Sequence, residues 1–246
     1  MERITPGIVR KALQPACPTH RATDLSNEEK VIRLKNLFVE AAQSVCPGWE
    51  VRSDSKEAIN AIFYWCLGAD GPLDPRKGLW LYGPNGTGKS TMLEVVRAFC
   101  RMIGRRDAWG RPYGFAITNA THICGEYSVG GSAAIEKYGT LRRQAFDEVG
   151  AEPTLSNNFG TPLNVMQHIL QIRYDRRHTG DFTHATSNID PEEIRTLYAP
   201  RIYDRCKEMF NFVYLGGKSF RGRLETHFAP PDPAACSGLP VNANMA

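Results

Sequence analysis

The segment GPNGTGKS at residues 83–90 is the stretch whose residue types and spacing point most directly to chemistry. It matches the pattern G-x-x-x-x-G-K-[S/T] in full. Glycines at this spacing let backbone N–H groups turn toward an anion, and the positive end of a following helix strengthens the attraction. An apolar run precedes the segment and a helix-like run follows it, so the strand–loop–helix context is also present. We therefore predict a phosphate-binding loop, hereafter the phosphate loop.

The polar side chains of the phosphate loop have predicted roles. Lys89 is expected to contact the β- and γ-phosphates of a bound nucleotide, and the Ser90 hydroxyl is expected to be a ligand of Mg²⁺. The alternative is a glycine-rich turn that contains a lysine by chance, and the full pattern in this context argues against it. The predicted nucleotide-binding residues are Gly83, Pro84, Asn85, Gly86, Thr87, Gly88, Lys89, Ser90 and Thr91.

Two adjacent acids, Asp147 and Glu148, lie near the end of the predicted strand at residues 141–150. Ligands of open α/β sheets bind at the carboxyl ends of the strands, so both carboxylates are expected there. Asp147 would hold Mg²⁺, and Glu148 would act as general base on the attacking water. An acidic strand-to-loop corner is the alternative. The strand begins with the polar segment LRRQ, so its start lies either near the sheet edge or at a displaced boundary.

Two further groups of polar residues follow in the chain. Asn188 ends the predicted strand at residues 182–188, and its amide is a candidate for holding the attacking water in line with the γ-phosphate. A simple strand-end turn is the alternative. Arg201 and Arg205 are four residues apart in a predicted helix, which places both guanidinium groups on one helix face. An ordinary exposed charged face is the alternative here.

Strand-like and helix-like segments alternate along the chain, which indicates an α/β domain with a largely parallel sheet. Asp54 with Glu57 predicts a capping box for the second helix, and Thr161 with Pro162 predicts the start of the fourth. The tail after residue 228 lacks apolar periodicity, and we expect it to be disordered. We expect helices at residues 26–46, 54–68, 90–103 and 162–177, and strands at residues 79–83, 113–119, 141–150, 182–188 and 210–216.

These motifs occur in the order found in one family. The segments GLWLYGPNGTGKST, FDEVG, TSNIDPEEI, YAPRIYDRC and GGKSFRGR resemble those of AAA+ ATPases of the helicase-loader group, of DnaC and DnaI type, and of the related IstB-type transposition helpers. The resemblance covers residues 55–223. It implies a three-layer P-loop fold of AAA+ type with a mostly parallel sheet, preceded by N-terminal helices. It also implies ATP and Mg²⁺ as cofactors.

The resemblance also assigns roles to three arginines. In such proteins ATP lies between the subunits of a homo-oligomer, and an arginine of one subunit completes the site of its neighbour. Arg205 resembles this trans-acting arginine finger, with Arg201 beside it as a second cation or as support for the interface. Arg221 resembles the arginine that senses the nucleotide in cis. The predicted catalytic set is then Lys89, Glu148, Asn188, Arg201, Arg205 and Arg221, with Ser90 and Asp147 as metal ligands.

The function that the resemblance implies is an ATP-hydrolysing DNA replication accessory protein that loads a ring-shaped replicative helicase onto single-stranded DNA. An IstB-like helper of a transposase stays open, as does a nucleotide-gated adaptor with little hydrolysis, which the polar LRRQ start would suit. A small-molecule kinase fits less well, because a second acid beside Asp147 is typical of hydrolases. We expect an N-terminal arm and helix at residues 1–50, an ATPase domain at 51–227 and a tail at 228–246.

A basic loop is the candidate for DNA contacts. Cations interleaved with aromatic rings suit phosphate neutralisation and base stacking. A solvated loop with one aromatic ring packed against the core is the alternative. The loop contains Arg105, Arg106, Trp109, Arg111 and Tyr113.

Composition limits which cellular compartment and which classes of partner the sequence favours. Seven cysteines, an odd number without a C-x-x-C pair, favour free thiols in a reducing cytoplasm over a disulfide framework. Cys17 and His20 have the spacing of half a zinc site, but no second pair with ligand spacing follows. No apolar run is long enough to span a membrane. The net charge of +4 permits binding to nucleic acid without requiring it.

Overall fold

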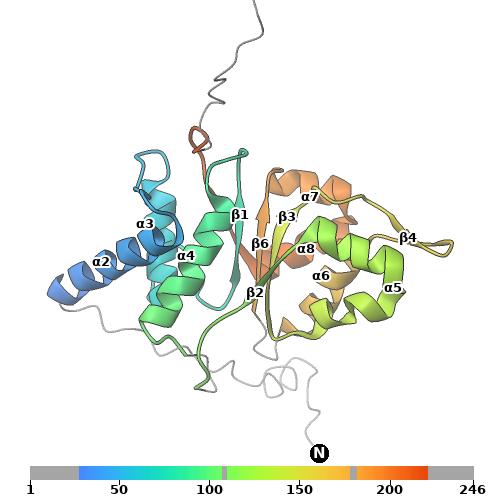
Figure 1. Ribbon diagram of the computed structural model, residues 1–246, viewed down its shortest axis with the longest axis horizontal. Coiled ribbons are helices and arrows are strands. Elements are labelled where there is room, and N and C mark those ends of the chain that lie inside the picture. Colours follow the sequence, from blue (N-terminus) through green and yellow to red (C-terminus); the bar gives the residue numbers. More distant parts are fainter. Residues whose placement is uncertain (1–27, 107–109, 178–181, 221–246) are drawn as a thin grey trace, which may run out of the picture.

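A computed structural model describes residues 28–106, 110–177 and 182–220 of the chain. Its centre is a five-stranded sheet in the order β2-β3-β6-β1-β7, in which all neighbouring strands are parallel (Figure 1). All five strands were predicted from the sequence, although several boundaries differ by a few residues. They are β1 (Gly78–Tyr82), β2 (Ala116–Asn119), β3 (Arg143–Val149), β6 (Phe182–Ser187) and β7 (Phe210–Tyr214).

Helices cover both faces of the sheet, so the predicted three-layer α/β architecture is confirmed (Figure 1). Strand β1 shows why both faces need cover, because Leu79 and Leu81 join one buried cluster and Trp80 joins the other. No helix in the described part of the chain is long and apolar enough to cross a bilayer. One face carries α2 (Glu28–Val45), α3 (Lys56–Leu67) and α4 (Lys89–Met102), and the other carries α5 (Ala120–Thr140), α6 (Val165–Asp175), α7 (Pro191–Leu197) and α8 (Pro200–Met209).

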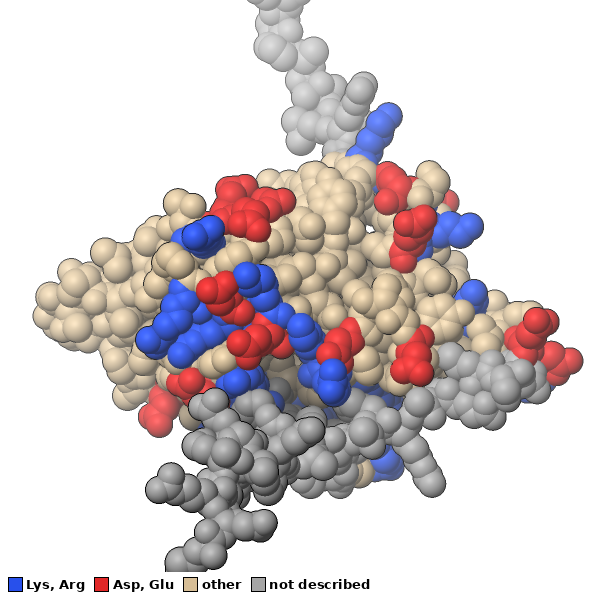
Figure 2. Space-filling model, turned by 180° about the vertical axis from the view of Figure 1, so that it is seen from behind, with Lys and Arg blue, Asp and Glu red and all other residues tan. Residues whose placement is uncertain are grey.

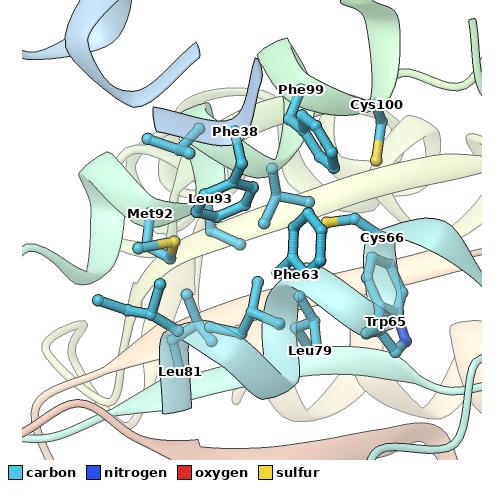
Figure 3. Close-up of a cluster of buried hydrophobic side chains, with 14 of the residues drawn as sticks. Phe38, Phe63, Trp65, Cys66, Leu79, Leu81, Met92, Leu93, Phe99 and Cys100 are labelled. Atoms are coloured by element: carbon cyan, nitrogen blue, oxygen red, sulfur yellow. The ribbon is translucent and has the colours of Figure 1, made fainter. Parts of the chain in front are cut away.

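Aromatic rings from three helices meet in the first cluster (Figure 3). Phe38 of α2 makes edge-to-face contacts with Phe63 of α3 and Phe99 of α4, with ring centroids 5.7 and 5.1 Å apart. This geometry is the one that aromatic pairs favour. The helix predicted within residues 1–50 therefore packs directly on α4, which follows the phosphate loop. The division of the chain at residue 50 stays a prediction.

The predicted capping box at the start of α3 was wrong. The helix begins at Lys56, after Ser55, which has αR backbone angles and makes no capping hydrogen bond through its side chain. The Asp54 carboxylate lies instead beside Gly217, where an added Cβ would be 2.3 Å from Asp54 Oδ2. Packing against the segment after β7 thus overrides a local capping signal.

The predicted start of the fourth helix was also wrong. Thr161 and Pro162 belong to β5 (Thr161–Leu163), which pairs with β4 (Ser156–Asn158) in an antiparallel hairpin. Proline is tolerated there because a two-stranded hairpin consists of edge strands. Helix α6 begins at Val165, where the Asn164 side chain accepts a hydrogen bond from Gln167 N at 3.0 Å.

Helices α5 and α7 were not predicted. Gly131 lies inside α5 with φ 64° and ψ −157°, so the helix is kinked and its apolar pattern does not keep one period. Helix α7 has seven residues, too few for a clear period. Its start does carry a capping box between Asp190 and Glu193, a local signal that the sequence analysis missed.

The β4–β5 hairpin lies against α5 at one end of the molecule (Figure 1). Asn158 Nδ2 donates to Ser128 O at 3.2 Å, and Tyr127 Oη donates to Thr161 O at 3.0 Å. No Asp, Glu, Lys or Arg occurs from residue 153 to residue 172. Seen from behind, this end has an uncharged surface (Figure 2). A surface without cations does not favour contacts with nucleic-acid phosphates.

The polar start of β3 results from a displaced boundary. The strand begins at Arg143 and lies between β2 and β6, so it is not at the sheet edge. Gln144 is fully buried, and its amide nitrogen donates to Thr118 Oγ1 at 2.9 Å and to Ala145 O at 3.0 Å. The Gln144 amide nitrogen is therefore satisfied inside a buried central strand, whereas its Oε1 has no hydrogen-bond partner among the described residues.

Candidate nucleotide site

The phosphate loop connects β1 to α4 and has the backbone that its glycines permit. Gly83, Gly86 and Gly88 have φ values of 140°, 79° and 89°, which L side chains rarely adopt. Lys89 is only 7% exposed, and its Nζ donates to Gly83 O at 2.8 Å and to Pro84 O at 2.7 Å. The ammonium group is thus held over the loop, where a phosphate would compete with the loop carbonyls for it.

Three oxygen-bearing side chains meet beside the start of α4. Ser90 Oγ donates to Asp147 Oδ1 at 2.7 Å, and Thr186 Oγ1 donates to the same atom at 2.5 Å. They come from α4, β3 and β6, because the carboxyl ends of neighbouring parallel strands meet at one sheet edge. The two predicted metal ligands are therefore adjacent. Thr186 was not predicted as a site residue, although its position near the end of a predicted strand was a signal for it.

Glu148 is held from two sides. Its φ of 58° is uncommon for a residue other than glycine and turns the chain at the end of β3. Its backbone N–H donates to Thr186 Oγ1 at 2.9 Å, and its carboxylate accepts a hydrogen bond from Asn119 Nδ2 at 2.8 Å. Asn119 also caps α5 by accepting from Thr121 N. Asn119 is a site residue that the sequence analysis missed, although it ends a predicted strand as Asn188 does.

A cavity of about 430 Å³ is lined by Lys89, Ser90, Glu148 and Thr186, together with other residues. Its volume is within the range of small-molecule sites. The phosphate loop from Asn85 onward and Thr91 line one wall, and Glu148 and Thr186 line the end near the sheet. Asn188 is exposed and also faces this cavity. The structure thus brings Asn188 to the predicted site, and its role there stays a prediction.

The second wall of the cavity comes from segments outside the predicted motifs. Trp49 and Ile59 contribute from the α2–α3 region, and Leu215 and Phe220 contribute from the segment after β7. Phe220 N donates to Gly86 O at 2.8 Å, and the Arg52 guanidinium lies 3.4 Å from the centre of the Phe220 ring. Apolar surface beside a phosphate loop suits the base of a nucleotide. No pattern in the sequence indicated this wall.

The residues at the site fit a nucleotide with its magnesium ion. Mg²⁺ prefers oxygen ligands and is usually bound by one or two protein side chains together with substrate phosphates and water. Ser90 Oγ and Asp147 Oδ1 are adjacent oxygen atoms of this kind. The described ranges contain no group of three or more His, Cys, Asp or Glu that would hold a metal by itself. Cys17 and His20 lie outside the described residues.

The paired arginines lie on α8, and neither lines the cavity. Arg201 is exposed, and its Nη2 donates to Gln171 Oε1 at 3.2 Å. The Arg205 guanidinium lies 4.6 Å from the centre of the Tyr174 ring, and its Nη1 is buried without a hydrogen-bond partner among the residues that the structure describes. The predicted helix is confirmed. Arg221 lies outside the described residues.

Part of the basic loop predicted for DNA contacts is a packing element. The Arg105 guanidinium lies 4.6 Å from the ring centres of both Trp65 and Tyr113, and it donates to Trp65 O at 3.2 Å. Tyr113 is 1% exposed. Arg105 and Tyr113 are therefore unavailable to DNA. For Tyr113, the alternative of an aromatic ring packed against the core is correct. Trp109 lies outside the described residues, and the remaining candidates are Arg106 and Arg111.

No protein-family model and no curated protein matches this chain, but solved structures do. A protein described as a candidate primosome component of Streptococcus pyogenes serotype M3 is 21% identical, with a TM-score of 0.50 over 69% of this chain and 84% of that one. DnaI is 19% identical, with a TM-score of 0.51 over 73% and 93%. The DnaC helicase loader is 14% identical, with a TM-score of 0.50 over 70% and 95%. At these identities the likeness shows a shared fold, and the predicted three-layer α/β fold with a mostly parallel sheet is confirmed.

Proposed function

We propose that this chain is an ATPase that loads a replicative ring helicase onto single-stranded DNA. The observation that carries the proposal is the convergence of Lys89, Ser90 and Glu148 on one cavity of nucleotide size, with Asp147 bonded to Ser90. The choice of helicase loading rests on analogy with DnaI and the DnaC helicase loader, which share the fold.

In the proposed reaction, water attacks the γ-phosphorus of ATP, the bond to the β–γ bridging oxygen breaks, and ADP and phosphate leave. Lys89 exchanges the loop carbonyls for the β- and γ-phosphates, and Glu148 accepts a proton from the attacking water. Asn188 orients that water from the cavity wall. Ser90 and Asp147 would hold Mg²⁺, which would offset the phosphate charge when it is bound with ATP.

The proposed active unit is a homo-oligomer in which the arginines of α8 complete the site of a neighbouring subunit. The resemblance to the family made Arg205 the finger and Arg201 its support. The exposure of Arg201 and the contact of Arg205 with Tyr174 favour the reverse, with Arg201 reaching the neighbour and Arg205 supporting the interface. Such a finger is worth about 10³–10⁵ in rate in GTPases. Arg221 is proposed as the arginine that senses the nucleotide in cis.

The deciding experiment is an affinity capture with Glu148→Gln in an extract of the cells that encode the chain. This variant should still bind ATP. Its single-turnover hydrolysis rate should be about 10²- to 10⁴-fold lower than that of the wild-type chain, because the general base is removed. The variant should therefore retain its partner, and the captured proteins are identified by mass spectrometry. Lys89→Ala is the matched control, since without the phosphate-binding ammonium it should hold neither ATP nor the partner.

Recovery of a ring helicase with Glu148→Gln, but not with Lys89→Ala, is the expected result. Recovery of a transposase instead would make the chain an IstB-like helper with the same nucleotide site. Equal hydrolysis by the wild-type chain and Glu148→Gln would favour a nucleotide-gated adaptor. The polar segment LRRQ, which suited the adaptor in the sequence, no longer favours it, because Leu141 and Arg142 precede β3 and the Gln144 amide nitrogen is hydrogen-bonded inside the strand.

A further inference from the structure

A buried carboxylate links the two functional elements of the chain. The Glu152 side chain is 7% exposed and the Tyr198 side chain is 3% exposed, and Tyr198 Oη donates to Glu152 Oε1. Glu152 follows the acidic pair of β3 by four residues. Tyr198 precedes by three residues Arg201, the first of the paired arginines.

On the side of the nucleotide site, Glu152 closes the turn that carries Glu148. Its Oε2 accepts a hydrogen bond from Gly150 N at 2.7 Å, and Ala151 N donates to Glu148 O at 3.0 Å. Gly150 has φ 95°, so the chain reverses immediately after the strand. The position of the Glu152 carboxylate therefore depends on the turn that holds the proposed general base.

On the side of the arginines, Tyr198 lies at the junction of α7 and α8. Its backbone N–H closes α7 by donating to Ile194 O at 2.9 Å. Ala199 is the N-cap residue of α8, and its N–H donates to Gln167 Oε1 at 2.9 Å. Tyr198 thus joins the end of α7 to the N-cap residue of α8, and the direction of Arg201 depends on where α8 begins.

Pairing the buried Glu152 carboxylate with Tyr198 costs free energy, which points to a role for the direction that this hydrogen bond imposes. Burial of a carboxylate is unfavourable, and both hydrogen-bond donors to Glu152 are uncharged groups. Burial, and then the nearby Glu152 carboxylate, raise the pKa of Tyr198 well above its usual value, so that Tyr198 stays a hydrogen-bond donor. Two apolar residues would fill the same space without this cost, but they would not impose a direction on the contact.

We propose that the Glu152–Tyr198 hydrogen bond is a positioning contact that makes the arginines of α8 respond to the nucleotide bound in the same subunit. A shift of the Glu148 turn on ATP binding moves the Glu152 carboxylate, and Tyr198 carries this movement to the start of α8. The inference rests on the proposed function, because it requires that a neighbouring subunit uses these arginines.

Mixed oligomers of full-length chains test the proposal. Acceptor subunits carry Arg201→Ala with Arg205→Ala, so they hydrolyse ATP only beside a neighbour that supplies arginines. Donor subunits carry Glu148→Gln, which binds ATP without turnover, or Lys89→Ala, which binds none. We expect Glu148→Gln donors to restore hydrolysis better than Lys89→Ala donors. Tyr198→Phe in the donor should remove this difference and lower the restored kcat by about 10- to 100-fold, the effect of a small misplacement.

The KM of the acceptor sites for ATP separates positioning from general damage, because it should stay within about twofold. The matched control is Tyr138→Phe in the donor, which removes another hydrogen bond from a buried tyrosine to a carboxylate, here the partly exposed Glu126 Oε1 at 3.0 Å. This control should restore hydrolysis fully. If thermal unfolding shows that Tyr198→Phe does not fold, Glu152→Gln is used in the same arms, since it keeps the side-chain volume and an acceptor for Gly150 N.

Two outcomes overturn the inference in different ways. In the first outcome, donors that combine Tyr198→Phe with Glu148→Gln still restore hydrolysis better than donors that combine Tyr198→Phe with Lys89→Ala. The coupling then does not run through Tyr198, while the shared site stands. If no donor restores hydrolysis in acceptor subunits, the shared site of the proposed function fails, and the inference fails with it.

Discussion

Asn119 Nδ2 lies 2.8 Å from Glu148 Oε2, and this hydrogen bond ties β2 to the proposed general base. Asn119 also pairs in register with Asp147, so one residue of β2 borders both acids. A carboxylate that accepts a hydrogen bond from an amide is oriented toward that amide. The end of β2 therefore restrains the group on which the proposed hydrolysis depends.

Asn119→Ser should raise the basal rate of ATP hydrolysis by about three- to tenfold, because Glu148 is released toward the attacking water. Serine retains the N-cap acceptor that α5 needs. The rate is measured at saturating ATP without partner or DNA. Asn164→Ser, which alters the corresponding N-cap of α6 away from the cavity, is the matched control and should leave the rate unchanged. A lower rate for Asn119→Ser would mean that the hydrogen bond positions Glu148 for catalysis.

Arg201→Ala and Arg205→Ala should differ in what they lose. Arg201→Ala should lower the hydrolysis rate of the assembled protein by at least about 10²-fold if it is the finger, with little change in stability because the side chain is exposed. Arg205→Ala should lower the free energy of unfolding by roughly 1 kcal/mol, since its contact with the Tyr174 ring is lost.

Steady-state hydrolysis and urea unfolding measure the two effects, with Arg195→Ala on the exposed face of α7 as control. Loss of hydrolysis in Arg205→Ala at unchanged stability, with Arg201→Ala still active, would restore the assignment of Arg205 as the finger.

Arg173→Met should lower the free energy of unfolding by at least about 3 kcal/mol. Arg173 is 2% exposed, and its guanidinium donates to the carbonyl oxygens of Tyr138, Leu141 and Phe182 at 3.0, 2.7 and 2.8 Å. Methionine would leave these buried acceptors without a donor. Urea unfolding is the measurement, and the exposed Arg195→Met should change the free energy of unfolding by less than about 0.5 kcal/mol. Equal effects of the two substitutions would contradict a structural role for Arg173.

Stability should fall with acidity because His184 is buried in its neutral form. Burial lowers the pKa of His184 from 6.5 to about 3. Leu79 N donates to Nδ1 at 3.1 Å, so the added proton would displace that hydrogen bond. Between these pKa values the unfolded chain binds a proton that the folded chain does not. This group's contribution to stability is therefore complete above about pH 6.5 and is lost as the pH falls, by about 1.4 kcal/mol per unit.

Urea unfolding of the wild-type chain at pH 7.5, 6 and 5 should show this loss, and His184→Gln should show a slope smaller by about one proton. His168→Gln, at an exposed position, should keep the wild-type slope. The same slope for His184→Gln as for the wild-type chain would mean that other groups cause the pH dependence.

Local signals in the sequence predicted the strands and the phosphate loop. Strand β1 is buried on both faces, so it reads as an apolar run, and the loop requires glycines at set positions. The paired arginines were found because helical spacing is visible in the sequence. Where one residue type serves several local structures, the prediction failed. Thr161-Pro162 suits a helix start as well as the edge strand that the chain adopts, and the glycines that kink α5 concealed a long helix.

By itself, the sequence determined the fold class, the loop that would hold the phosphates and the acids beside it. Tertiary structure decided which distant residues join them. Asn119 reaches Glu148 only because β2 and β3 are neighbours in the sheet, and Trp49 meets Phe220 across the cavity only because the chain returns there after β7. The same applies to Glu152 and Tyr198, which are 46 residues apart. Such contacts depend on strand order and layer packing, which no local pattern of residue types encodes.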